Sequence, residues 1–286
     1  MTDKTKGVLV VLGASVMWAI EPVVVKLSYQ TTDVSSTFAT RALFCLLTIL
    51  AYLLIKRIDL RIEKRYLPKL IYVSLVGTLF ADLMYIYALS KIPVINAVLI
   101  GHMQPIFIVV MGYLVLKTDR ITRFDYLGIF FMIVAGLLVT SRDLQNLLRL
   151  RIGTVGDLYV LLATIAWATT AIVARKYLQG LDAAIIAFYR FLFGTAVFVA
   201  YLTATSTIEV TNVYQIILGV VIGTGTILYY EGIRRIKAAQ VGALELSTPF
   251  FAAMLGYAVL RESLTPLQLC GMLSLLGGIY FLSRKE

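Results

Sequence analysis

Runs of about twenty apolar residues recur from one end of this 286-residue chain to the other. The first covers residues 7–27, and its only charged residues are Glu21 and Lys26. A helix of that length, rising ~1.5 Å per residue, spans the roughly 30 Å hydrocarbon core of a bilayer. Hydrophobic residues make up 60% of the chain and charged residues 15%, against about 45–50% and about 25% in soluble proteins. The chain is therefore predicted to be an all-α polytopic membrane protein.

Ten transmembrane helices are predicted, with both ends of the chain on the same side. A cleaved signal peptide is not expected, because the first run is long and nine similar runs follow it. The predicted spans are 7–27, 36–55, 69–89, 94–116, 124–141, 157–174, 183–203, 213–232, 239–260 and 266–283.

The basic residues give the orientation. The side that holds both termini receives 18 of the 26 Lys and Arg residues, and the other side receives 6. The positive-inside rule then places both termini in the cytoplasm, with the protein in the cytoplasmic membrane, the inner membrane of a cell that has two. This distribution explains the net charge of +10 without a nucleic-acid partner. Segment 142–155 faces outside, and its leucine spacing predicts a short interfacial helix.

The two halves of the chain resemble each other. L-G-A-S-V-M-W-A at 12–19 matches L-L-A-T-I-A-W-A at 161–168, which places Trp18 opposite Trp167. The same offset pairs Arg41 with Arg190 and Lys26 with Arg175.

A second match lies further along each half. Residues 105–117 and 249–261 share a Pro, a Gly, a Tyr and a terminal basic residue in the same order. We therefore predict a first five-helix repeat over 1–141, an external connection over 142–155 and a second repeat over 156–286. Five is an odd number, so the second repeat must be inverted, as in many alternating-access transporters.

The repeat ends also resemble a known family. A-L-S-K-I-P-V-I-N-A-V-L-I-G-H-M-Q-P at 88–105 and its copy ending in R-E-S-L-T at 261–265 look like the ends of EamA repeats, from the drug/metabolite transporter (DMT) superfamily. The resemblance implies ten spans around a central cavity and, often, export of amino acids and related metabolites. The first repeat departs from the family at Thr118, where the family has Glu.

Charged side chains at membrane depth are costly, so each one requires a reason. Arg41 and Arg190 occur in both repeats and either hold the bundle together or bind a carboxylate or phosphate of the substrate. Trp18 and Trp167 also occur in both, and either line a cavity or pack between helices.

Glu21 occurs in one repeat only, because its counterpart is Thr170. Three roles are open for it: coupling to a proton or cation, recognition of an amine, or a salt bridge to Lys26 or Arg41. It shares a helix face with Trp18.

Asp82 and Tyr85 share one face of the third predicted span, and the second repeat has no acid at that depth. They either contact a substrate amine or form buried hydrogen bonds, with Thr78, Tyr85 or Arg41 as the candidate partners of Asp82.

Two further titratable residues lie in single copies. His102, the only histidine, is either a hydrogen-bonded packing residue or a proton relay. Glu245 is a candidate for the inward vestibule of the cavity. Glu231, by contrast, precedes Arg235 by one helical turn and is interpreted as half of a structural salt bridge.

These residues together predict a secondary transporter. Two other classes of membrane protein, an enzyme and a channel, are weighed against it. The sequence has no G-x-x-x-x-G-K-[ST] motif, no metal motif and no identifiable cofactor site. An integral-membrane enzyme has little support, because His102 is the only histidine that could serve as a catalytic base. The predicted partners are a small polar substrate such as an amino acid and the lipid bilayer, with protons as a candidate coupling ion. A transporter of drugs, nucleobases or organic cations, and a channel, are the alternatives.

Overall fold

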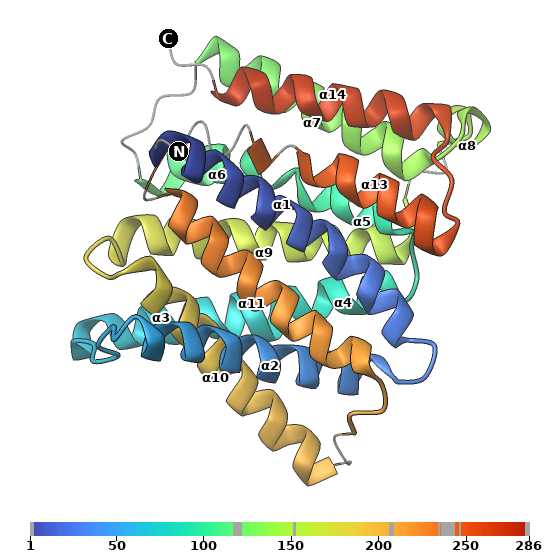
Figure 1. The fold of residues 1–286 in the computed structure, drawn as a ribbon. Coiled ribbons are helices and arrows are strands. Elements are labelled where there is room, and N and C mark those ends of the chain that lie inside the picture. Colours follow the sequence, from blue (N-terminus) through green and yellow to red (C-terminus); the bar gives the residue numbers. More distant parts are fainter. Residues whose placement is uncertain are drawn as a thin grey trace.

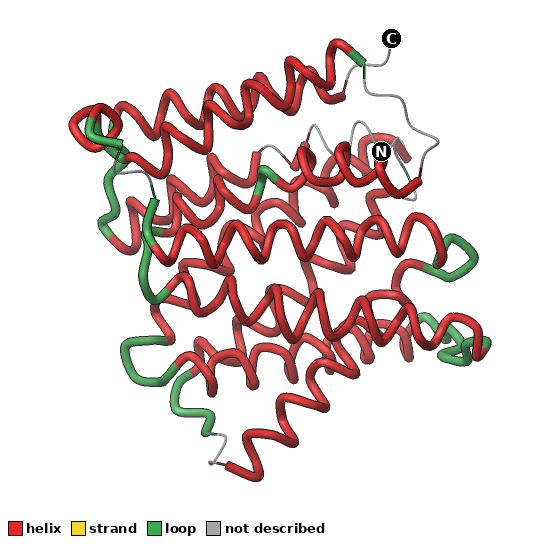
Figure 2. The backbone as a smooth tube through the Cα atoms, turned by 180° about the vertical axis from the view of Figure 1, so that it is seen from behind, coloured by secondary structure: helices red, strands yellow, loops and turns green. Residues whose placement is uncertain are grey.

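The computed structural model describes residues 3–116, 122–150, 153–205, 209–233, 235, 244–245 and 247–283. This part of the chain consists of helices and loops, without strands (Figure 2). The prediction of an all-helical protein is confirmed. The longer helices are α1 (Asp3–Ser28), α2 (Val34–Ile55), α7 (Arg123–Ser141), α9 (Val155–Tyr177), α10 (Ala183–Thr205), α11 (Val213–Ile233), α13 (Ser247–Leu260) and α14 (Pro266–Ser283).

Eight helical segments of the described chain are long and apolar enough to cross a membrane. They correspond to the first eight predicted spans. Two shorter apolar helices, Ser247–Leu260 and Pro266–Leu282, fall within the ninth and tenth. Residues 239–243 and 246 of the predicted ninth span, and Thr118, lie outside the described residues. A multi-pass membrane protein follows from these helices, whereas ten crossings stay a prediction.

Two of the membrane-spanning segments are not continuous α-helices. The third joins a 3₁₀ turn, an α-helix, a π-helix and a second α-helix, and the fourth bends at His102. The bend precedes Pro105, which has no N–H to give to the helix. These pieces are η1 (Lys64–Tyr66), α3 (Leu67–Tyr72), η2 (Val73–Asp82), α4 (Leu83–Leu89), α5 (Val94–Gly101), α6 (Gln104–Met111) and η3 (Gly112–Leu116).

The helices pack in pairs that join the first half of the chain to the second. Helix α1 packs on α11 and α13, while α9 packs on η2, α4, α5 and α6. Helix α2 packs on α10 and α11, and α7 packs on α14 at one edge of the bundle (Figure 1). The largest apolar cluster therefore draws on both halves, with Phe38 of α2 and Phe198 of α10 in edge-to-face contact at 4.7 Å.

Figure 1 also shows the directions of the helices. Helix α1 begins, and α9 and α14 end, at the same end of the bundle, so α1 and α9 run in opposite directions. The short helix α8 (Leu144–Leu148) lies at the other end. Leu144 and Leu148 are exposed on it, as expected for a helix that rests on a membrane interface.

The other end also holds a buried polar group outside the apolar core. Asn96 of α5 donates a hydrogen bond to Asp157 of α9 (3.0 Å) and accepts one from Gln268 of α14 (2.6 Å). Asp157 and Thr154 form a capping box that satisfies the first N–H groups of α9. These bonds fix where α9 begins, and so how deep its later residues lie in the bundle.

Candidate functional site

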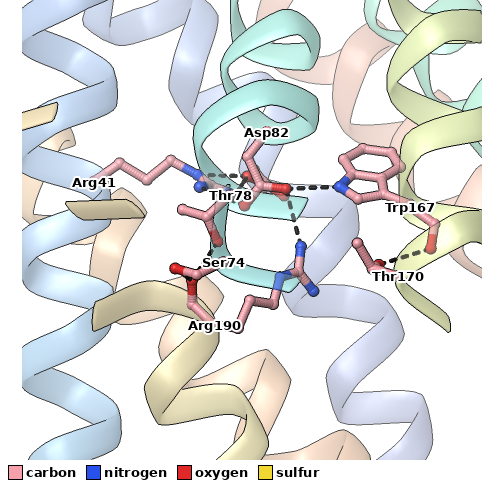
Figure 3. A network of polar contacts seen from close by, with 8 residues as sticks. Arg41, Ser74, Thr78, Asp82, Trp167, Thr170 and Arg190 are labelled. Atoms are coloured by element: carbon pink, nitrogen blue, oxygen red, sulfur yellow. Dashed lines mark hydrogen bonds and ion pairs between the residues drawn. The ribbon is translucent and has the colours of Figure 1, made fainter. Parts of the chain in front are cut away.

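Asp82 is buried and accepts hydrogen bonds from side chains on three helices (Figure 3). Its Oδ1 accepts from Trp167 Nε1 of α9 at 2.7 Å and from Arg190 Nη2 of α10 at 2.9 Å. Its Oδ2 accepts from Arg41 Nη1 of α2 at 3.4 Å. Because the Asp82 side chain is only 2% exposed, these three donors replace the water it would otherwise bind.

Glu21 completes the group from the side of α1. Its Oε1 accepts from Nε and Nη2 of Arg41 at 2.8 and 2.5 Å. Of the two salt bridges considered for Glu21, the structure forms the one with Arg41. Lys26 instead pairs with Glu262 at 2.8 Å. The Arg41 guanidinium is thus bonded on both sides, and its side chain is 5% exposed.

The π-helix η2 holds α10 beside Asp82. Ser74 and Thr78 of η2 donate to the backbone carbonyl of Arg190 at 2.5 and 2.9 Å, and Ser74 Oγ accepts from Gly194 N at 2.7 Å. The hydroxyl of Thr78 therefore bonds to the Arg190 carbonyl, so Thr78 is not the partner of Asp82 among the three that the sequence left open. A π-helix realigns the side chains that follow it, and such segments are frequent at functional sites.

The formal charges of the group cancel. Two carboxylates, Glu21 and Asp82, face two guanidinium groups, Arg41 and Arg190, within hydrogen-bond distance. Removing charges from water costs several kcal/mol per ion unless each is paired, so such a cluster is stable only as a whole. We name Glu21, Arg41, Asp82, Trp167 and Arg190 the central charge network.

The two tryptophans have different surroundings, although the sequence pairs them. Trp167 donates to Asp82 and packs on Tyr85, with ring centroids 5.4 Å apart. Trp18 packs on Tyr229 instead, with ring centroids 5.1 Å apart. Tyr85 contributes its ring to the packing against Trp167. Of the three partners proposed for Asp82, which were Thr78, Tyr85 and Arg41, the one that bonds to Asp82 in the described structure is Arg41.

His102 and Glu245 lie outside the central charge network. His102 is half-buried at the bend between α5 and α6, where its Nδ1 lies 2.7 Å from the Val98 carbonyl. Glu245 shares a hydrogen bond with Tyr229, next to Trp18. Neither is brought to Asp82 by the fold.

Glu231 has the structural partners that its position in the sequence suggests. It forms an ion pair with Arg235 one turn away and accepts from Tyr52 at 2.5 Å. Across the described residues, no three His, Cys, Asp or Glu side chains lie close enough together to hold a metal ion.

The sequence analysis missed a second charged contact, which lies at the C-terminal end of α1. Glu262, in the connection between α13 and α14, accepts from Lys26 Nζ with one oxygen and from the backbone N–H of Val94 with the other, both at 2.8 Å. It therefore joins the end of α1 to the start of α5. The signal was present, because Glu262 lies in the R-E-S-L-T stretch and Lys26 has a counterpart in Arg175.

Comparisons with known proteins place the chain in a family. The sequence profile of the EamA-like transporter family matches residues 5–141 and 154–284. An uncharacterized transporter of Methanothermobacter thermautotrophicus is 26% identical over 230 residues, 78% of this chain and 66% of that protein. One of Synechocystis sp., sll1164, is 28% identical over 208 residues, 67% of this chain and 58% of that protein.

Two further comparisons are more distant. The pseudopaline exporter CntI of Pseudomonas aeruginosa is 26% identical over 135 residues, 47% of this chain and 46% of that protein. A protein crystal structure with 14% sequence identity superposes with a TM-score of 0.66 over 97% of this chain and 96% of that one, which shows a shared fold.

All three named relatives are described as transporters or exporters. The family profile matches nearly the whole length, once in each half of the sequence. The chain therefore belongs to the EamA-like transporter family, within the drug/metabolite transporter superfamily.

Proposed function

We propose that this protein is a secondary transporter that exports small polar metabolites, such as amino acids, across the cytoplasmic membrane. It works by alternating access through a central cavity between two inverted five-helix repeats, with ten spans and both termini in the cytoplasm. Protons are the candidate coupling ion, since the sequence contains no nucleotide-binding motif.

The central charge network is the observation that carries this proposal. Asp82 and Arg41 come from the first half of the chain, and Trp167 and Arg190 come from the second. Transporters of this kind bind substrate near the midplane, between repeats. Charged groups at that depth are expensive and are retained mainly for function.

The packing of the helices supports inverted repeats. Helix α1 packs on the later helices α11 and α13, and its counterpart α9 packs on the corresponding third and fourth segments of the first half. Helices α1 and α9 also run in opposite directions (Figure 1). This exchange of partners is expected when two copies of one bundle are related by an axis in the membrane plane.

The bonds of Glu262 support a state that is closed on one side. Lys26, Glu262 and Val94 join three segments at the end of the bundle predicted to face outside. Arg41, in the outer half, is 5% exposed, whereas its counterpart Arg190 is 31% exposed. This asymmetry is what an inward-facing transporter would have.

Export is supported by one relative, which is described as an exporter of pseudopaline. A transporter of drugs, nucleobases or organic cations would use the same fold and is the alternative to an amino-acid exporter. A channel is the second alternative, because inverted repeats can also enclose a pore.

Flux measurements in liposomes test the proposal. Purified protein should give saturable counterflow of an amino acid, and Trp167→Ala should weaken it. Saturable flux of nucleobases or organic cations alone would favour the first alternative, and flux proportional to concentration would favour a channel. For coupling, Glu21→Gln is expected to abolish pH-driven flux and to weaken counterflow less, since it also removes a charge that pairs with Arg41. Equal loss of both activities would point to a folding defect.

A further inference from the structure

Arg41 and Arg190 occupy equivalent positions in the two halves but differ in their bonds. Arg41 uses Nε, Nη1 and Nη2 for hydrogen bonds to two carboxylates. Arg190 has one side-chain hydrogen bond, from Nη2 to Asp82, and its buried Nε has no hydrogen-bond partner among the described residues. Of this pair, Arg190 is the one that retains hydrogen-bonding capacity.

The difference comes from one position on the preceding helix of each half. Glu21 supplies a carboxylate to Arg41, and the residue equivalent to Glu21 in the second half is Thr170. The Thr170 hydroxyl donates to the carbonyl of Trp167 on its own helix at 2.8 Å. The second half therefore has the arginine of this ion pair but not its carboxylate.

Thr170 and Arg190 nevertheless lie beside the same point of η2. A Cβ atom placed on Gly77 would lie 3.4 Å from Thr170 Cγ2 and 3.5 Å from Arg190 Nε. Figure 3 shows Thr170 and the Arg190 guanidinium on the same side of the Asp82–Trp167 bond. Gly77, which has no side chain, and the small side chain of Thr170 thus flank the side of Arg190 that carries Nε.

We propose that Arg190 binds the carboxylate of the transported substrate at the place that corresponds to Glu21 in the first half. This assignment rests on the proposed function and makes Arg41 a structural residue. The planar guanidinium offers Nε and a terminal nitrogen in parallel, the geometry that a carboxylate accepts with two hydrogen bonds. The Arg190 side chain is 31% exposed and that of Arg41 is 5% exposed, so a substrate reaches the exposed part of Arg190 and bonds to Nε once the atoms that cover it move aside.

The charges of the network restrict the substrate further. Glu21, Asp82, Arg41 and Arg190 already sum to zero, so an added carboxylate would leave one uncompensated negative charge in a buried site. A substrate that carries its own positive charge avoids this cost, and so does one that arrives with a proton. The site should therefore prefer zwitterions to simple anions and to amines without a carboxylate.

A substitution that needs no substrate tests the geometry. Thr170→Glu adds the missing carboxylate beside Arg190 and should raise the melting temperature of the detergent-purified protein while blocking flux. In an Arg190→Gln background the same substitution should lower it, because the new carboxylate has no partner. Thr169→Glu is the matched control. The Thr169 hydroxyl accepts a hydrogen bond from Tyr72 and makes none with Arg190, so the same added charge should lower the melting temperature in both backgrounds.

A binding experiment tests the ligand. Each of the twenty L-amino acids is added in a thermal-shift assay, and the strongest stabiliser is compared with its amide and its N-acetyl derivative. The free amino acid should stabilise the protein more than either derivative. Arg190→Lys, which keeps the charge but loses the fork, should weaken amino-acid binding by about tenfold or more.

The outcomes separate this assignment from the proposed function. Equal melting-temperature changes for Thr170→Glu in both backgrounds, normal flux in Thr170→Glu, or undiminished affinity in Arg190→Lys would each overturn the role of Arg190. Saturable flux only of compounds without a carboxylate would overturn it too, and would leave a transporter of another substrate. Absence of saturable flux of any metabolite would overturn the proposed function instead.

Discussion

At the scale of single residues, equivalent positions in the two halves have acquired different partners. Trp18 packs against Tyr229, whereas Trp167 donates to Asp82. Asp82 has no acidic counterpart in the second half, and it bonds to arginines from both. A few residue differences between the two halves of a duplicated sequence are thus enough to give one polar centre in place of two separate ones.

Asp82→Asn should destabilise the protein strongly. The change keeps the size of the side chain but removes a buried negative charge that faces two guanidinium groups, a loss of about 3–5 kcal/mol for a broken buried pair. Thermal unfolding in detergent measures this. Glu63→Gln is the control, because the Glu63–Arg65 pair is about 65% exposed on both sides and should contribute almost nothing. Identical melting temperatures for the two variants would contradict a structural role for Asp82.

The two tryptophans allow a matched comparison. Trp167→Phe keeps an aromatic ring but removes the N–H that bonds to Asp82, so it should cost about 1.5–3 kcal/mol for a hydrogen bond to a charged group. Trp18→Phe keeps its packing on Tyr229 and should cost less. The difference in melting temperature between the variants checks this, and a larger loss at Trp18 would be the opposite of the expected result.

At the scale of helices, the segments that position the site are the irregular ones. The third segment presents Asp82 at the end of a π-helix, and Ser74 and Thr78 in that π-helix hold the backbone of Arg190. The fourth segment starts at Val94, whose N–H is held by Glu262. A single carboxylate therefore connects the end of α1, the start of α5 and the link to α14.

A double-mutant cycle on Lys26 and Glu262 tests that connection. Lys26→Met and Glu262→Gln should each lower the melting temperature, and their coupling energy should be near 1 kcal/mol, since the pair is only partly exposed. Exchange of the two charges, with Lys26→Glu and Glu262→Lys combined, should recover part of the loss. Strictly additive effects would show that the contact does not join the segments energetically.

At the scale of the whole molecule, the two halves form one bundle, because the longer helices pack mainly on helices from the other half. Helix α1 and helix α9 both have their principal partners across the repeat boundary. Neither half could therefore bury its apolar surface in the same way alone. Motion of one half against the other would have to rearrange the central charge network, because residues of both halves bond to Asp82.

Labelling with a membrane-impermeant maleimide tests the topology. In a variant without Cys45 and Cys270, a cysteine replacing Leu148 should be labelled in intact cells, and one replacing Glu63 only after the membrane is opened. Leu148 is exposed on α8, and Glu63 lies in the basic loop at the opposite end of the bundle. The reverse pattern would invert the predicted orientation.

The sequence by itself determined the class, the positions of most helices and the repeat, because hydropathy and residue order are local properties. It also identified Arg41, Asp82 and Arg190 as residues that needed a reason to lie at membrane depth, since a charge there is costly wherever it points. For Trp167 it offered only a cavity wall or helix packing. It could not choose between the partners, and for Asp82 it included Thr78 and Tyr85, neither of which bonds to it.

Only the tertiary structure decided which charges meet. Arg41 lies 20 residues from Glu21, and Arg190 lies 108 residues from Asp82, so their contacts depend on how whole helices pack. The same packing left His102 and Glu245 away from Asp82 and gave Lys26 to Glu262, 236 residues away. The energy of an ion pair depends on separation and burial in space, and neither quantity is encoded in the spacing of two residues along a chain.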